Sequence, residues 1–290
     1  MPPTLKNMAI SKFPSMCLFH TSIHGSTLII TYRKPGPPET SPPTLKIPLE
    51  PKDLSSLEKL NIDMHYSPTV AYNMGSKYND WFSECFGFKV VLAYWGGNPR
   101  LVLGNLPSPP QSPLVHAISM LPFVGARFKA APEGFIAFSD CAPFLCITEE
   151  SAADISSRLD EGLEMDITKF RANIVLKGSP SAFDEDFWAG LKFKNGVEII
   201  LTANCGRCVS LNVDYETGQS GTGRDGSVLK LMMKDRRVDE GTKYSPVFGR
   251  YGFVGRRSEG RDLNVGEEVF VSRRIEERTK FCELERDFSK

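Results

Sequence analysis

The sequence lacks several features that mark whole classes of protein. No run of apolar residues approaches the length of about 18 that a membrane-spanning helix needs, so we expect no membrane anchor in this chain. The opening residues, Met1 to Lys6, contain no hydrophobic stretch of the signal-peptide kind. Neither sign of charge is in excess, because 35 Lys and Arg balance 35 Asp and Glu. This balance argues against a protein that binds through charge to nucleic acid or an anionic membrane.

Cysteine and proline indicate the compartment and the organisation of the chain. Seven cysteines, an odd number, in a chain without a signal peptide favour free thiols in a reducing compartment. Prolines crowd residues 35–51 and 107–113, where neither interior helix nor central strand is expected. A length of 290 residues suits two lobes. We therefore predict a first lobe over 1–104, a linker over 105–113, a second lobe over 114–272 and a charged tail over 273–290.

The spacing of apolar residues predicts an α+β chain with many short strands and few helices. The expected strands are residues 16–19, 27–32, 45–49 and 90–94, followed by 144–147, 173–176, 197–202 and 209–213. One helix is expected over 76–86 and should end at Gly87. A second should begin after Thr148 as N-cap and extend through Leu159 and Leu163. Residues 263–271 predict a hairpin that turns at Gly266, and the whole pattern favours a β-barrel.

The segment Asn-Cys-Gly-Arg-Cys at 204–208, between two expected strands, is the strongest chemical signal. A structural zinc site would need two further ligands close by, and a thioredoxin-type dithiol would favour a following helix. Two interpretations therefore stay open. In the first, one of the cysteines is a single thiolate ligand to a soft metal, with Arg207 beside it. In the second, both are ordinary loop cysteines.

Three other segments carry polar groups next to expected strands. Arg171 and Asn173 precede a strand and offer a donor fork and an amide, although an ion pair between lobes would explain them equally well. Asp140 follows Ser139 before another strand and could be a turn cap. The segment Tyr-Ser-Pro-Val-Phe-Gly-Arg-Tyr at 244–251 is aromatic and basic, as core aromatics around a loop can also be.

Taken together and in this order, these segments resemble the MOSC family, the domain named for the C-terminal part of molybdenum-cofactor sulfurase. Within the family they are most similar to the mitochondrial amidoxime-reducing component type. The matching segments are residues 138–159, 170–175, 204–218, 244–251 and 265–269. The resemblance implies a MOSC β-barrel domain with peripheral helices, preceded by a smaller, β-rich N-terminal lobe. It also implies that this lobe is truncated, without the anchor and first basic strand found in the family.

The resemblance implies a molybdenum-cofactor (molybdopterin) oxidoreductase that reduces N-hydroxylated small molecules, with cytochrome b5 and cytochrome b5 reductase as electron donors. By this resemblance Cys208 ligates molybdenum and Asp140 lies near the metal. The implied cofactor-binding residues are Arg171, Asn173, Gly206, Arg207 and Tyr251. The family suggests the mitochondrial outer membrane, whereas the expected lack of an anchor suggests the cytoplasm.

Two alternatives to this enzyme remain. The chain could be a non-catalytic or degenerate MOSC module that carries the cofactor. It could instead be a thiol redox or metal-binding protein that uses Cys205 and Cys208. Sulfurase also carries a pyridoxal-phosphate domain, for which this chain has neither the length nor the lysine site, so sulfur transfer is not expected.

Overall fold

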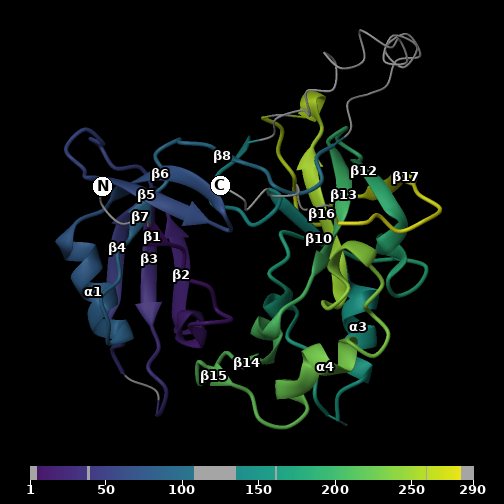
Figure 1. The fold of residues 1–290 in the computed structure, drawn as a ribbon, viewed down its shortest axis with the longest axis horizontal. Helices are drawn as coiled ribbons and strands as arrows, with labels where there is room; N and C mark the ends of the chain where they lie inside the picture. Colours follow the sequence, from purple (N-terminus) through teal and green to yellow (C-terminus); the bar gives the residue numbers. More distant parts are fainter. Residues whose placement is uncertain (1–4, 38–39, 108–134, 161, 259, 282–290) are drawn as a thin grey trace, which may run out of the picture. The chain divides into compact units, whose positions relative to one another are not determined.

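The computed structural model describes residues 5–37, 40–107, 135–160, 162–258 and 260–281. Within them the chain is rich in strands and has few helices (Figure 1). It divides into two compact units, one formed by residues 1–99, 155–169 and 207–232 and the other by 100–154, 170–206 and 233–290. Most of the predicted linker and part of the predicted tail lie outside the described residues, as do residues 114–134 of the predicted second lobe.

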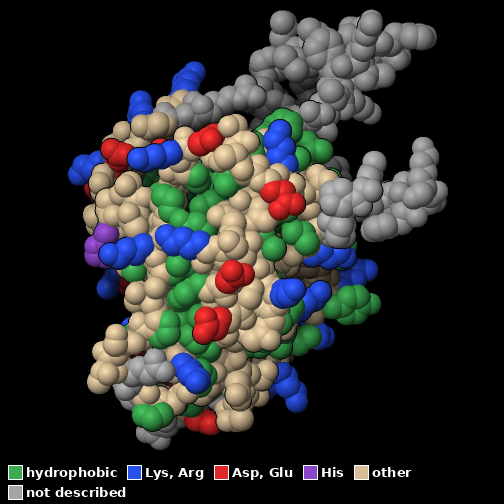
Figure 2. All heavy atoms as spheres, turned by 90° about the vertical axis from the view of Figure 1, so that its left-hand side faces the viewer, with side chains coloured by type: hydrophobic (Ala, Val, Ile, Leu, Met, Phe, Trp, Pro, Cys, Tyr) green, Lys and Arg blue, Asp and Glu red, His purple; other side chains and the backbone are tan. Residues whose placement is uncertain are grey.

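Residues 5–94 of the first unit form two small sheets. One is an antiparallel meander of β2 (Phe19–His24), β3 (Thr27–Tyr32) and β4 (Thr44–Pro48). The other has the order β1 (Leu5–Lys6), β5 (Lys59–Met64), β6 (Ser67–Asn73) and β7 (Ala93–Tyr94). The face shown in Figure 2 has basic and acidic side chains interspersed around a broken band of hydrophobic ones, in keeping with the zero net charge.

Helix α1 (Ser76–Phe86) covers the meander and occupies the predicted range. Its apolar side chains Tyr78, Trp81 and Phe82 pack against a buried cluster that includes Ile30 and Leu45. The helix ends at Gly87, whose φ of 76° gives the predicted left-handed C-cap. Apolar spacing and a terminal glycine are local signals, and here they were sufficient to place the helix.

Two short segments of the first unit were predicted as strands and are 3₁₀ helices. Residues 16–19 fall largely in η1 (Pro14–Leu18), because Pro14 sits in its first turn, where a fixed φ and a missing N–H are tolerated. Residues 209–212 form η4 (Val209–Asn212), and only β14 (Val213–Asp214) is extended, paired with β15 (Gln219–Ser220). In η4, Val209 is exposed while Ser210 is buried, the reverse of the alternation that predicted a strand.

The second unit is built on a six-stranded sheet. Its order is β11 (Ile174–Leu176), β10 (Phe144–Thr148), β16 (Val247–Val254), β13 (Glu198–Gly206), β12 (Trp188–Phe193) and β17 (Val269–Arg274). Only β10 and β11 are parallel, and all other neighbours are antiparallel. Trp188, Leu191, Ile199 and Leu201 belong to its buried core. Two further strands, β8 (Arg100–Leu101) and β9 (Phe135–Ile136), form a separate pair.

The crossover from β10 to β11 contains α3 (Glu149–Ser157). Thr148 is the N-cap as predicted, since its Oγ1 accepts a hydrogen bond from the backbone N–H of Ser151 at 3.2 Å. The helix is shorter than predicted and ends before Leu159 and Leu163. Leu163 is 45% exposed, so no apolar face extends the helix to that point.

The other helices in the described segments are short. They are η2 (Ile167–Phe170), η3 (Asp184–Phe187), η5 (Asp225–Ser227), α4 (Val228–Met232), η6 (Glu240–Thr242) and η7 (Arg256–Ser258). None of the helices in the described part of the chain combines the length and the apolar composition needed to cross a membrane.

The predicted hairpin over 263–271 is wrong. Gly266 does occupy a turn, with a φ of 83°, but β17 begins only at Val269 and pairs with β12, more than 70 residues earlier in the chain. The strand then continues through Arg273 and Arg274, which we had assigned to the tail. Arg274 forms an ion pair with Asp184, so this charged segment is anchored by a distant partner.

Candidate functional site

The six-stranded sheet brings three segments that are far apart in sequence onto neighbouring strands (Figure 1). Asn173, at the start of β11, hydrogen-bonds with Leu145 of β10 through both its backbone N–H and its side-chain Oδ1. Leu145 pairs with Tyr251 of β16, and Tyr251 pairs with Ala203 of β13. Asn173 and Tyr251 therefore lie in one row across the sheet, and this row ends at Ala203 on the strand that leads to Cys208.

Gly249 allows β16 to approach β10 closely. Its φ is 82°, and a Cβ at this position would lie 2.7 Å from the carbonyl oxygen of Cys146. A residue with a side chain would separate the two strands, which explains the glycine in the segment 244–251. Phe248, next to it, is fully buried and stacks on Phe170, with ring centroids 3.8 Å apart.

Arg171 is exposed and has a φ of 53°, which is unusual for a residue with a side chain. Its neighbours impose this conformation. Phe170 is held by the stack on Phe248, and Asn173 is held by its two hydrogen bonds to Leu145. The strained backbone places the Arg171 side chain at the surface, just before the first residues of β11.

We expected the segment 204–208 to be a loop between two strands, and this prediction is wrong. Strand β13 continues through Gly206, which pairs with Val247 of β16, and η4 follows Cys208. Cys205 is 3% exposed and points into the protein, whereas Cys208 is exposed. The Cys208 thiol lies 3.2 Å from the Ser210 hydroxyl oxygen, and Arg207 between the two cysteines is buried. Of the two sulfur atoms, that of Cys208 is the accessible one.

Asp140 and Tyr251 form a hydrogen-bonded pair. The Tyr251 hydroxyl donates to Oδ2 of Asp140 at 2.8 Å. Burial, reinforced by nearby Cys205 and Asp140, raises the pKa of Tyr251 well above its usual range, so its hydroxyl remains a neutral donor. The side chain of Tyr251, expected among the cofactor-binding residues, is buried, and its hydroxyl group binds the Asp140 carboxylate.

Arg100, a residue that sequence analysis did not single out, holds the backbone around Asp140. Its guanidinium group donates to the carbonyl oxygens of Ala137, Ser139 and Asp140. The side chain is only 3% exposed, and a lone arginine after a proline gives no recognisable motif. The adjacent Cys141 thiol has its pKa raised to about 12, mainly by burial, so it is a protonated neighbour of the pair.

A second group of buried polar side chains lies at the end of β13. Arg250 donates from Nη1 to Oδ1 of Asn204 and to the hydroxyl oxygen of Thr279. Asn204 in turn donates from Nδ2 to Asp239 and to the carbonyl oxygen of Thr279. Arg278 forms an ion pair with Asp186. Residues 275–281, which we had assigned to a charged tail, are therefore tied through Thr279 to β13, the strand that leads to Cys208.

Within the described residues, no three His, Cys, Asp or Glu side chains are grouped in a way that could hold a metal ion. The accessible thiol of Cys208 is thus a single ligand of the kind that soft metals prefer. Exposed Arg171 adds a rigid donor fork that suits phosphate. A single thiolate fits a metal whose other ligands come from a bound organic cofactor.

In the comparison with known protein families, the model described as the MOSC domain matches residues 133–270. Among curated proteins, mitochondrial amidoxime-reducing component 1 of Danio rerio is 36% identical over 135 residues, which is 47% of this chain and 38% of that protein. The human protein of the same name is 36% identical over 144 residues, or 48% of this chain and 40% of its own length. Molybdenum cofactor sulfurase of Caenorhabditis briggsae is 31% identical over 141 residues, or 49% and 18%. The chain spans less than half the length of these relatives.

Proposed function

Residues 133–270 form a MOSC domain, and from this premise we propose that the chain binds a molybdenum–pterin cofactor and reduces N-hydroxylated compounds of the amidoxime and hydroxylamine type. The observation that carries the proposal is the exposed thiol of Cys208, two residues beyond β13, whose neighbour β16 bears Tyr251. The finer fold assignment, a MOSC β-barrel, belongs to the same proposal.

Each candidate residue has a role in holding the cofactor. The Cys208 thiolate would ligate molybdenum, and Gly206 and Arg207 would border the pterin. Arg171 would neutralise a phosphate through its guanidinium fork, and Asn173 would keep that arginine in place through its bonds to β10. When bound, such a cofactor supplies the two-electron redox chemistry that no amino acid side chain provides.

Reduction of an N–O bond to an N–H bond consumes two electrons and two protons and releases water. Asp140 is the candidate for moving protons, because its Oδ2 accepts a hydrogen bond from Tyr251 while its backbone is held by Arg100. Tyr251 is then a positioning residue rather than a direct ligand. The family resemblance proposes cytochrome b5 and its reductase as electron donors, and the cytoplasm or the mitochondrial outer membrane as the location.

The test is elemental analysis of the full chain produced in a host that makes the molybdenum cofactor. We expect near-stoichiometric molybdenum in the wild type and in Cys205→Ser, and strong depletion in Cys208→Ser. Equal molybdenum in the wild type and Cys208→Ser would refute Cys208 as the ligand. Amidoxime reduction with an artificial electron donor should then follow the molybdenum content.

Other outcomes would identify the alternatives. Stoichiometric molybdenum without turnover would indicate a non-catalytic carrier. Absence of pterin together with a reversible Cys205–Cys208 disulfide would indicate a thiol redox protein. The structure provides little support for that last function, because one of the two sulfur atoms is buried and the other is exposed.

A further inference from the structure

A cavity of about 300 Å³ opens in the first unit, between the β2–β4 meander and helix α1. Its lining combines two aromatic rings, a proline, a thiol and two opposite charges, contributed by Tyr32, Lys34, Pro43, Trp81, Glu84 and Cys85. None of these residues belongs to the candidate molybdenum site. The volume lies at the lower end of the range of about 300–1,000 Å³ that is usual for small-molecule sites.

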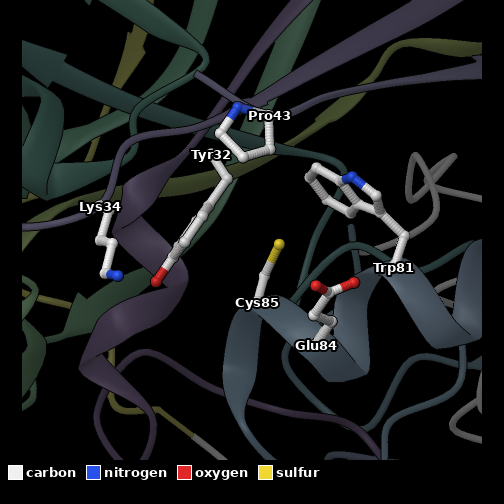
Figure 3. Close-up of a pocket in the computed structure, with 6 residues that line it drawn as sticks. All are labelled: Tyr32, Lys34, Pro43, Trp81, Glu84 and Cys85. Carbon is white, nitrogen blue, oxygen red and sulfur yellow. The ribbon is translucent and has the colours of Figure 1, made fainter. Parts of the chain in front are cut away.

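The spacing on α1 explains why three of these side chains meet. Trp81, Glu84 and Cys85 are separated by three and four positions, so they lie on one face of the helix. Figure 3 shows the Tyr32 ring and the Trp81 indole on opposite sides of an open space, with the Cys85 sulfur between them. Burial and the Glu84 carboxylate raise the pKa of Cys85, so the cavity is lined at this point by a protonated, uncharged thiol.

The two aromatic rings that line the cavity, those of Tyr32 and Trp81, pack against other aromatic side chains of the first unit. The ring of Phe19 lies 4.8 Å from that of Tyr32 and 6.0 Å from that of Trp81, measured between centroids. Trp81 also makes an edge contact with Phe82 at 5.1 Å. A ligand would therefore meet rings already held in place, with little ordering cost on binding.

The two charges lie at different ends of the cavity. In Figure 3 the Lys34 ammonium is near the Tyr32 hydroxyl, while the Glu84 carboxylate is near the Trp81 indole. Both side chains are exposed, and neither Lys34 nor Glu84 forms an ion pair with another described residue. Each charge is thus available to a ligand of the opposite sign.

We propose that this cavity binds a small zwitterion with a quaternary ammonium group at one end and a carboxylate or phosphate at the other. The ammonium end would lie against Trp81 and beside Glu84, where the ring quadrupole and the carboxylate both attract a cation. A methylated ammonium group suits this end of the cavity better than a primary ammonium group does. It gives up less hydration free energy on burial, and its methyl groups offer apolar surface to the indole ring. Lys34 would bind the anionic end as a point charge.

The experiment is calorimetric titration of the full chain with phosphocholine and glycine betaine, with choline and inorganic phosphate as half-ligands. We expect at least one zwitterion to bind about tenfold more tightly than either half-ligand, a difference of about 1.4 kcal/mol. Glu84→Gln should weaken zwitterion binding about tenfold, whereas Asp80→Asn, which removes an exposed charge from the same helix, should leave it unchanged. Trp81→Phe should weaken binding while preserving the packing on Phe19.

Lys34→Gln should reduce the affinity for the zwitterion to that for choline and leave choline binding unaltered, with Lys46→Gln as the matched control. The proposal is overturned if neither zwitterion binds, if Glu84→Gln and Asp80→Asn behave alike, or if choline binds as tightly as phosphocholine and betaine. Because the titration requires no molybdenum, its result is independent of the proposed redox function.

Discussion

Arg250 on β16 donates from Nη1 to the side-chain oxygen of Asn204 on β13 at 2.6 Å, and the two residues face each other in the register of the sheet. Arg250 is completely buried, and burial lowers the pKa of its guanidinium group to about 10, opposed by Asp186 and Asp239. The group therefore stays cationic at neutral pH. It ties the strand that leads to Cys208 to the segment around Thr279.

Replacing Arg250 with methionine should destabilise the protein by about 3 kcal/mol, because it leaves the buried Oδ1 of Asn204 without its donor and removes a cation that interacts favourably with Asp186 and Asp239. Urea unfolding followed by circular dichroism would measure the loss. Arg257→Met, at an exposed position, is the control and should change stability by less than about 0.5 kcal/mol. Similar unfolding midpoints for the two variants would contradict a structural role for Arg250.

The thiol of Cys208 should react with iodoacetamide much faster than those of Cys205, Cys146 and Cys141. Cys208 is exposed, whereas burial raises the pKa of both Cys141 and Cys146 to about 12. Timed labelling of the native protein, read by mass spectrometry of peptides, would rank the four sites. Equal labelling of Cys205 and Cys208 would show that the end of β13 opens in solution.

Arg171→Gly should separate binding from folding. Glycine adopts a φ of 53° without strain, so the free energy of unfolding should be equal to that of the wild type or up to about 1 kcal/mol higher. Molybdenum retention after gel filtration should nevertheless fall, because the guanidinium group is lost. Full retention in this variant would make Arg171 a structural residue only.

Tyr251→Phe should lower kcat for amidoxime reduction about tenfold and leave KM and molybdenum content unchanged, because it removes only the hydrogen bond that orients Asp140. Steady-state kinetics combined with elemental analysis would distinguish these quantities. Tyr244→Phe, at a residue that is 84% exposed, should behave as the wild type. If molybdenum is lost together with activity, Tyr251 contributes to cofactor binding instead.

Glu185→Gln should alter how stability depends on pH. Glu185 is completely buried, and burial raises its pKa above the ordinary carboxyl value. Its contribution to stability is therefore fully present below the unfolded-state pKa and is lost as the pH rises through the folded-state pKa. The variant should match the wild type near about pH 4 and become increasingly more stable toward neutral pH. Parallel stability curves from urea unfolding, with exposed Glu164→Gln as control, would contradict this assignment.

Much of the local structure was predictable because its signals involve near neighbours in the chain. Helix α1 with its Gly87 cap, strand β3 and the Thr148 cap of α3 all follow from apolar spacing and terminal residues. The same reasoning failed at 209–212, where a run of a few alternating residues could not distinguish a strand from a 3₁₀ helix. The candidate residues were named from motif order, and their roles stay predictions.

The order of motifs in the amino-acid sequence was sufficient to identify the resemblance to the MOSC family, and that resemblance proposed Cys208 as the candidate ligand. Only the tertiary structure decided which of two nearby sulfur atoms is accessible, since exposure depends on how β13 pairs with β16. It also brought Arg100 to the backbone of Asp140 and Thr279 to Arg250. Those contacts join residues dozens of positions apart, so they arise from strand pairing and side-chain burial rather than from any local pattern.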